Sequence, residues 1–231
     1  YGCNPKYITE YILENYPNEF DVVWVIDNIV DIPESIPQNV RVVRYFSNEY
    51  LYELHTAGFV ICNARTDDSY FWTKRKGQVY IQTWHSSLRL KNIEKDAEKT
   101  LPESYIQAAK GDSEKIDYII SGCAFSSRIF KNSFWYDGKI LECGTPRIDY
   151  LLKEANKKEI FEKTDFSEDY KYILYAPTFR TDDAYQYNLD FEKLVRVCEE
   201  QFGGNWKVLY RLHPNLLFKI KEQTLPDVCI D

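Results

Sequence analysis

The 231-residue sequence lacks several features that define common classes of protein. No apolar run approaches the roughly 18 residues of a membrane span, and Phe59-Val60-Ile61-Cys62 is typical of the longest. No signal peptide is visible. Positive charge is not in excess, because 29 Lys and Arg stand against 36 Asp and Glu for a net charge of −7. This balance argues against a general nucleic-acid-binding protein, but it allows a local basic pocket for one anionic ligand.

Short motifs of three enzyme classes are absent as well. The sequence has neither GxGxxG nor GxxxxGK[ST], which disfavours nicotinamide-dependent enzymes and P-loop NTPases. It has no GxSxG, which disfavours serine hydrolases. No CxxC pair or Cys/His cluster occurs among the six cysteines, so we expect reduced core thiols of a cytosolic protein and no zinc site.

Methionine is missing from the whole sequence, which begins at Tyr1. We therefore expect a fragment of a longer protein, or a sequence from which modified methionines have been dropped. In the second case some spacings are shorter here than in the complete chain.

The residues that are present suit a folded α/β protein. Hydrophobic residues make up 44% and aromatic residues 16% of the chain, enough for a core, and the charged residues are spread along it. Helical spacing of apolar residues begins at Tyr7, and Ser47 is expected to cap a helix that stops at Gly58. Strands are expected at 21–26, 40–43, 59–62, 79–84, 118–120 and 140–141. Apolar strands alternating with helices predict a parallel sheet covered on both faces.

A highly charged stretch divides the chain. We expect an N-terminal Rossmann-like domain at 1–152, a connector at 153–169 and a second domain at 170–231. The second begins with a βαβ unit: a strand at 172–176, a helix stopped by Gly203-Gly204, and a strand at 206–210. One face of that helix is expected to carry Phe191, Leu194, Val195, Cys198 and Phe202. The chain ends soon after the last strand, so we expect the second domain to be truncated.

Ligands of open parallel sheets bind where strands end, in the loops that lead into helices. The residues that follow the expected strands are His85-Ser86-Ser87, Gly144-Thr145-Pro146-Arg147, Pro177-Thr178-Phe179-Arg180 and Arg211-Leu212-His213-Pro214. A right-handed crossover between the last two strands would bring Arg180, Arg211 and His213 to one edge of the sheet. Two guanidinium groups and an imidazole there suit a phosphate or diphosphate.

The histidines and Arg147 each have two interpretations. His55 lies inside a helical pattern and is expected to be a surface or packing residue. His85 follows a strand beside Trp84, where a general base and a structural hydrogen bond are equally compatible with its position. His213 is similar, because Pro214 would fix the turn that aims its ring. Arg147 by itself is expected to be a structural cap or a surface pair.

At these positions the chain resembles the CDP-glycerol glycerophosphotransferases, the teichoic-acid polymerase family of bacterial cell-wall synthesis. The stretches that carry the resemblance follow the family's order and cover nearly the whole chain. They are Asn4-Pro5-Lys6-Tyr7-Ile8, Asn63-Ala64-Arg65, Tyr80-Ile81-Gln82-Thr83-Trp84-His85, Gly144-Thr145-Pro146-Arg147-Ile148-Asp149, Tyr175-Ala176-Pro177-Thr178-Phe179-Arg180 and Arg211-Leu212-His213-Pro214.

The resemblance implies a GT-B arrangement of two Rossmann-like domains, with the nucleotide-activated donor bound mainly by the second. It implies transfer of glycerol phosphate, or ribitol phosphate in some members, to a hydroxyl of a lipid-linked polymer. Two departures stand out. Ser86 replaces the glycine that usually follows the first histidine, and the chain stops before a later aspartate–tyrosine–serine–serine segment expected to complete the donor site.

The resemblance also implies roles for individual residues. His85 would be the catalytic base, and His213 would act near the donor phosphates. Donor phosphate would be bound by Arg180, Arg211 and Thr178, and substrate by Ser86, Arg147 and Asn4. No carboxylate cluster indicates a metal site and no cofactor is expected to be required, although Mg²⁺ on the donor diphosphate stays open.

The expected partners are CDP-glycerol or CDP-ribitol and a lipid-linked polyol-phosphate or glycan acceptor. The expected location is peripheral, on the cytoplasmic side of the bacterial membrane, through an anchor that lies outside this segment. Two rival functions stay open: a GT-B glycosyltransferase that uses a sugar nucleotide, and a non-catalytic module of a wall- or capsule-assembly protein.

Overall fold

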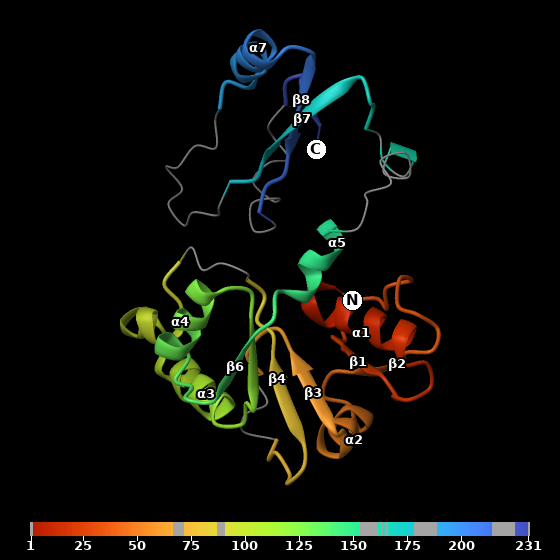
Figure 1. The fold of residues 1–231 in the computed structure, drawn as a ribbon, viewed down its shortest axis with the longest axis vertical. Coiled ribbons are helices and arrows are strands. Elements are labelled where there is room, and N and C mark those ends of the chain that lie inside the picture. The colour runs from red at the N-terminus through yellow and green to blue at the C-terminus, as the bar shows by residue number, and fades with distance from the viewer. Residues whose placement is uncertain are drawn as a thin grey trace. The chain divides into compact units, whose positions relative to one another are not determined.

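The structure is a computed structural model that describes residues 2–66, 72–86, 91–152, 161–162, 164, 166–177, 189–213 and 225–230. The chain forms two compact units, residues 1–154 and 155–231, and both contain parallel sheets (Figure 1). The α/β class predicted from the sequence is therefore confirmed. The predicted connector lies largely outside the described residues.

The described strands of the first unit form two sheets. Strands β1 (Val23–Ile26) and β2 (Arg41–Arg44) form a parallel pair. Strands β3 (Phe59–Cys62), β4 (Val79–Gln82), β5 (Tyr118–Ser121) and β6 (Lys139–Glu142) form a parallel four-stranded sheet in chain order. Since all four strands run the same way, their carboxyl ends share one edge of that sheet.

Helices and 3₁₀ turns connect these strands. The helices are α1 (Cys3–Asn15), α2 (Asn48–Thr56), α3 (Glu103–Ser113), α4 (Ala124–Ser133) and α5 (Asp149–Leu152), with 3₁₀ turns η2 (Glu94–Thr100) and η3 (Pro146–Ile148). Ser47 caps α2 as predicted, because its Oγ accepts a hydrogen bond from the Tyr50 N–H at 3.0 Å. Helix α2 ends at Thr56, just before Gly58.

The core of the first unit lies around the central strands. Tyr80 of β4 and Ile119 of β5 are completely buried, and α4 packs against β5 and β6. Phe130 and Phe134 of the α4 region pack edge to face, with ring centroids 5.0 Å apart. The strand predicted at 79–84 is shorter than expected, since it ends at Gln82 and leaves Thr83 and Trp84 in the following loop.

The second unit contains strands β7 (Tyr170–Tyr175), β8 (Asn205–Tyr210) and β9 (Cys229–Ile230), all parallel, in the order β7-β8-β9. Helix α7 (Phe191–Phe202) connects β7 to β8, so the predicted βαβ unit is confirmed. Asp190 caps this helix, and Gly203 ends it with φ 63°, a left-handed conformation that favours glycine.

Two details of this unit differ from the sequence interpretation. Phe202, expected on the same face of α7 as Phe191 and Val195, is 68% exposed at the last residue of the helix. Strand β9 was not predicted, since only two residues, Cys229 and Ile230, pair with β8. The buried residues are Phe191, Val195, Val208, Tyr210 and Leu212.

Candidate functional site

His85 leaves the carboxyl end of β4 as an exposed side chain. Its Nδ1 lies 2.8 Å from the backbone carbonyl oxygen of Asn63, in the loop that follows the neighbouring strand β3. A carbonyl oxygen can only accept, so Nδ1 must carry the hydrogen. In the neutral ring Nε2 therefore has the free lone pair, which is the requirement for a general base.

Trp84, the residue before His85, has a strained backbone. Its φ of 50° lies in the left-handed region, which is rare for a bulky side chain. The Trp84 N–H donates to Oε1 of Gln82 at 2.8 Å, and its carbonyl accepts from Nδ2 of Asn4 at 2.9 Å. The indole is buried against Phe134, and its centroid is 4.3 Å from that of the His85 ring. Packing and hydrogen bonds thus hold the conformation that presents His85.

Asn4 joins two loops at this edge of the sheet. Its Nδ2 also donates to the carbonyl of Thr83 at 3.3 Å, and its Oδ1 accepts from the N–H of Arg147 at 3.2 Å. The side chain is 1% exposed. The structure therefore connects three predicted site positions of the first unit, Asn4, the Trp84–His85 segment and Arg147.

Arg147 lies in η3, after β6, and is partly buried. Its Nη1 lies 3.7 Å from Sγ of Cys3. Gly144 makes the turn out of β6 with φ 94°, and its N–H donates to the carbonyl of Ser121 at the end of β5. Ser86, next to His85, is also partly exposed.

A buried ionic network supports the loop that holds His85, and it was missed in the sequence. Arg65 donates from Nε and Nη2 to Glu94, from Nη1 to Asp112 and Ser113, and from Nη2 to the carbonyl of Phe134. All five N–H groups of the guanidinium are thereby used. The side chains of Arg65, Glu94 and Asp112 are 6%, 2% and 0% exposed. Arg65 is two residues from Asn63, so the network anchors the segment whose carbonyl fixes the His85 ring.

Hydroxyl groups complete the network around the two carboxylates. Tyr105 donates to Oε1 of Glu94 at 2.6 Å, and Tyr80 and Thr66 donate to Oδ1 of Asp112 at 3.0 and 2.8 Å. Burial, with the neighbouring Cys62 and Asp112, raises the pKa of the Tyr80 hydroxyl well above its ordinary value. Burial and the hydrogen bond to Glu94 raise the pKa of Tyr105 too. Both hydroxyls therefore stay protonated donors at neutral pH.

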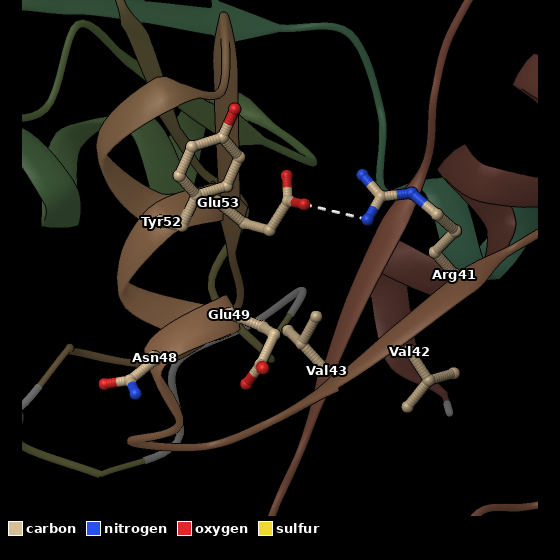
Figure 2. Close-up of a pocket in the computed structure, with 7 residues that line it drawn as sticks. All are labelled: Arg41, Val42, Val43, Asn48, Glu49, Tyr52 and Glu53. Atoms are coloured by element: carbon tan, nitrogen blue, oxygen red, sulfur yellow. Dashed lines mark hydrogen bonds and ion pairs between the residues drawn. The ribbon is translucent and has the colours of Figure 1, made fainter.

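A separate open pocket of about 570 Å³ lies between β2 and α2 (Figure 2). The described residues that line it are Arg41, Val42, Val43, Asn48, Glu49, Tyr52 and Glu53, and none of these is a predicted site residue. Arg41 is bonded to Asp21 and Glu53, and these partners raise its pKa further above its ordinary value. Among the described lining residues Arg41 is the one cation, and its guanidinium is already paired with two carboxylates.

The donor-side residues lie in the second unit. Arg211 and His213 follow β8 and are exposed, and the N–H of Arg211 donates to the carbonyl of Tyr175 at the end of β7. The parallel register pairs Tyr175 with Tyr210, so the chain leaves both strands at the same edge. Thr178 and Arg180 lie outside the described residues, so their convergence with Arg211 and His213 stays a prediction.

The described residues contain no group of three or more His, Cys, Asp or Glu side chains that could hold a metal ion. In the same part of the chain, no helix combines the length and apolar character needed to cross a membrane. All six cysteines are free thiols.

Ligands of open parallel α/β sheets bind at the carboxyl ends of the strands, and His85 follows the carboxyl end of the central strand β4. The comparisons with known proteins make the class specific. A family model described as CDP-glycerol:poly(glycerophosphate) glycerophosphotransferase matches residues 1–231. The chain belongs to this family, as its sequence motifs predicted.

Individual relatives agree. The chain is 31% identical to a teichoic acid poly(glycerol phosphate) polymerase of Staphylococcus epidermidis over 92% of its length, and 31% identical to one of Bacillus spizizenii, also over 92%. A structure of the wall teichoic acid polymerase TagF superposes with a TM-score of 0.80 at 30% identity over the whole chain. The chain spans 30% and 56% of the two polymerases and 57% of the TagF chain.

Proposed function

We propose that this chain transfers glycerol phosphate from CDP-glycerol to a hydroxyl of a lipid-linked teichoic-acid or capsule-type polymer, as part of a protein that releases CMP. Family membership and the names of the relatives support the reaction class. The observation that carries the mechanism is the His85 ring, which is exposed at a strand end with Nδ1 bound to the Asn63 carbonyl.

His85 acts as general base in an in-line displacement. The acceptor hydroxyl oxygen forms a bond to the β-phosphorus of the donor while the bond from that phosphorus to the bridging oxygen breaks. CMP leaves with the bridging oxygen and its electron pair, and Nε2 of His85 takes the hydroxyl proton. Such proton transfer contributes about 10²–10⁴-fold to rate. The Asn63 carbonyl, 2.8 Å from Nδ1, also stabilises the imidazolium that forms.

The positive groups of the second unit bind the donor diphosphate in this proposal. Arg211 and His213 are exposed beyond β8, and Arg180 and Thr178 join them in the role that the sequence predicted. Their charges offset the negative charge that builds on the diphosphate oxygens during transfer. Ser86 and Arg147 contact the substrate in the first unit.

Several expectations belong to the same proposal. The chain has the GT-B arrangement, with domains at 1–152 and 170–231 and a connector at 153–169. Two α/β units that each contain a parallel sheet support this assignment. The protein works peripherally at the cytoplasmic face of the membrane, and no cofactor is required, with Mg²⁺ on the donor diphosphate open.

The test measures CMP release by the full-length protein with a lipid-linked glycerophosphate acceptor. CDP-glycerol, CDP-ribitol and UDP-glucose are supplied side by side. Acceptor-dependent CMP release from CDP-glycerol is the expected result. CMP release from CDP-ribitol alone would show that the donor is CDP-ribitol instead. Release of UMP or UDP from UDP-glucose alone would identify the protein as a glycosyltransferase. If none of the three donors released a nucleotide, the result would favour a non-catalytic binding module.

His55 provides a matched control for the role of His85. It is also exposed, and its Nδ1 also lies 2.8 Å from a backbone carbonyl, that of Leu51. His85→Ala should lower CMP release at least about 100-fold and leave CDP-glycerol binding intact by calorimetry. His55→Ala should change neither. Loss of donor binding in His85→Ala would make His85 a structural or donor-binding group instead.

A further inference from the structure

The carboxamide of Asn4 is fully engaged inside the protein. Its two N–H groups donate to the carbonyls of Thr83 and Trp84, and its oxygen accepts from the N–H of Arg147. An asparagine side chain has two N–H donors and one oxygen, so each polar atom is used. With 1% of the side chain exposed, Asn4 presents no polar group to a ligand.

These bonds act on the two peptide groups that lead into candidate site residues. The Trp84 carbonyl belongs to the planar peptide that joins Trp84 to His85, and the Arg147 N–H belongs to the peptide that joins Pro146 to Arg147. The Asn4 side chain therefore restrains the orientation of both the Trp84–His85 peptide and the Pro146–Arg147 peptide.

The restraint is needed because the backbone is strained at this point. Trp84 has φ 50°, and its N–H and carbonyl are held by two side-chain amides, those of Gln82 and Asn4. The Trp84 carbonyl also accepts from Oγ1 of Thr83 at 3.1 Å, so Asn4 is one of two side-chain donors to this peptide and the one that comes from helix α1. Without the Asn4 bond the Trp84–His85 peptide keeps only the bond from its own loop, and Trp84 can relax out of the left-handed region. The His85 ring would then leave its place at the Asn63 carbonyl.

We propose that Asn4 is a positioning residue, which fixes the orientation of His85 and its spacing from Arg147. The sequence led us to expect that Asn4 contacts the substrate, and this proposal takes the place of that expectation. It rests on the proposed function, because Asn4 would affect the rate only through the position of His85. Helix α1 packs against η3, so the hydrogen bonds of Asn4 lie where two elements far apart in the sequence are in contact.

The test uses two substitutions in the full-length protein. Asn4→Asp keeps the size and the oxygen that accepts from Arg147, and it replaces the two donors with an oxygen that faces two carbonyls. Asn4→Ala removes all three bonds. Asn15→Asp is the matched control, since Asn15 lies on the same helix and also donates to a backbone carbonyl, that of Tyr11, but is exposed.

For Asn4→Asp we expect kcat for CMP release to fall about 10- to 100-fold with KM for CDP-glycerol unchanged, because misplacing a catalytic group by about 1 Å costs rate and not donor affinity. The ¹⁵N spectrum of the His85 ring should lose the pattern of a neutral imidazole protonated at Nδ1. Asn15→Asp should match the wild type in both measurements.

Three results would overturn the proposal: an unchanged His85 ring spectrum in Asn4→Asp, a rise in KM without a fall in kcat, or failure of both Asn4 variants to fold by circular dichroism. His85→Ala, measured in parallel, separates this inference from the proposed function. If His85→Ala keeps full CMP release, the general-base mechanism is wrong. The ¹⁵N spectrum of the His85 ring in Asn4→Asp still decides whether Asn4 positions His85.

Discussion

Removing the Arg65 guanidinium should be among the most destabilising single changes in the first unit. Arg65→Ala deletes five hydrogen bonds and leaves Glu94 and Asp112, which are 2% and 0% exposed, without their positive partner. Breaking a buried ion pair from one side costs about 3–5 kcal/mol, because a charge stays behind in the interior. At about 4 kcal/mol, a unit of this size loses about 8–16 °C in melting temperature.

Arg41→Ala is the matched control for this loss. Arg41 also bonds two carboxylates, Asp21 and Glu53, but its side chain is 49% exposed. Exposed pairs contribute about 0–1 kcal/mol, so Arg41→Ala should move the transition by a small fraction of the Arg65→Ala shift. Arg65→Lys should fall between them, since it keeps the charge and loses the five-donor geometry.

The assay is urea and thermal unfolding of the three variants at pH 7, followed by circular dichroism. The reasoning requires a clear difference between the buried and the exposed arginine. If Arg65→Ala lost no more stability than Arg41→Ala, the network would contribute little to folding, and its role as an anchor for the Asn63 loop would have to be abandoned.

Three further predictions concern stability. Gly138→Ala should lower the free energy of urea unfolding by about 1–3 kcal/mol, because a Cβ there collides with the buried ring of Tyr136. Gly58→Ala is the control and should be neutral or slightly stabilising, because a Cβ at that position has no atom within 4 Å. Equal effects of the two substitutions would contradict the packing at Gly138. Ser47→Ala should cost about 1 kcal/mol through loss of the α2 cap, and a Ser47→Asp variant should recover it. Burial, and then the Asp117 charge, raise the pKa of Tyr136 to about 12. An unfolded tyrosine titrates near 10, so this group's stabilising contribution is full below pH 10 and is lost between about pH 10 and 12. Tyr136→Phe should flatten that part of the stability profile, and an unchanged slope would argue against the shift.

Local patterns were sufficient for most of the fold. Short runs of aliphatic and aromatic residues predicted β3 and β8 closely. Ser47 and Gly203 marked helix ends, because capping and left-handed turns depend on single residues. Strand β9 was not predicted from the sequence, because its two residues, Cys229 and Ile230, are too few for a periodic signal. Helical spacing did not predict the exposure of Phe202, because spacing places residues on one face but does not say whether the last residue of the helix is covered.

The site was predictable only where it follows from sheet topology. His85 was found because ligands bind where parallel strands end, and its place after β4 agrees with that rule. The partners of Arg65 were not predictable, since Glu94 and Asp112 are 29 and 47 residues away. The left-handed Trp84 gave no signal either, because it depends on side-chain amides from Asn4 and Gln82 and not on a glycine.

The bond between Asn4 and Arg147 has a consequence for the order in which the molecule assembles. Strands β3 to β6 lie side by side in chain order, so each can add to its predecessor as the polypeptide emerges from the ribosome. The Asn4 bond instead spans 143 residues and closes a loop around the whole sheet. Contacts of such long range form late, because the entropy of closing the loop must be overcome first. We therefore expect the sheet to mature before the site, with the first and last segments of the unit meeting in the step that aligns His85.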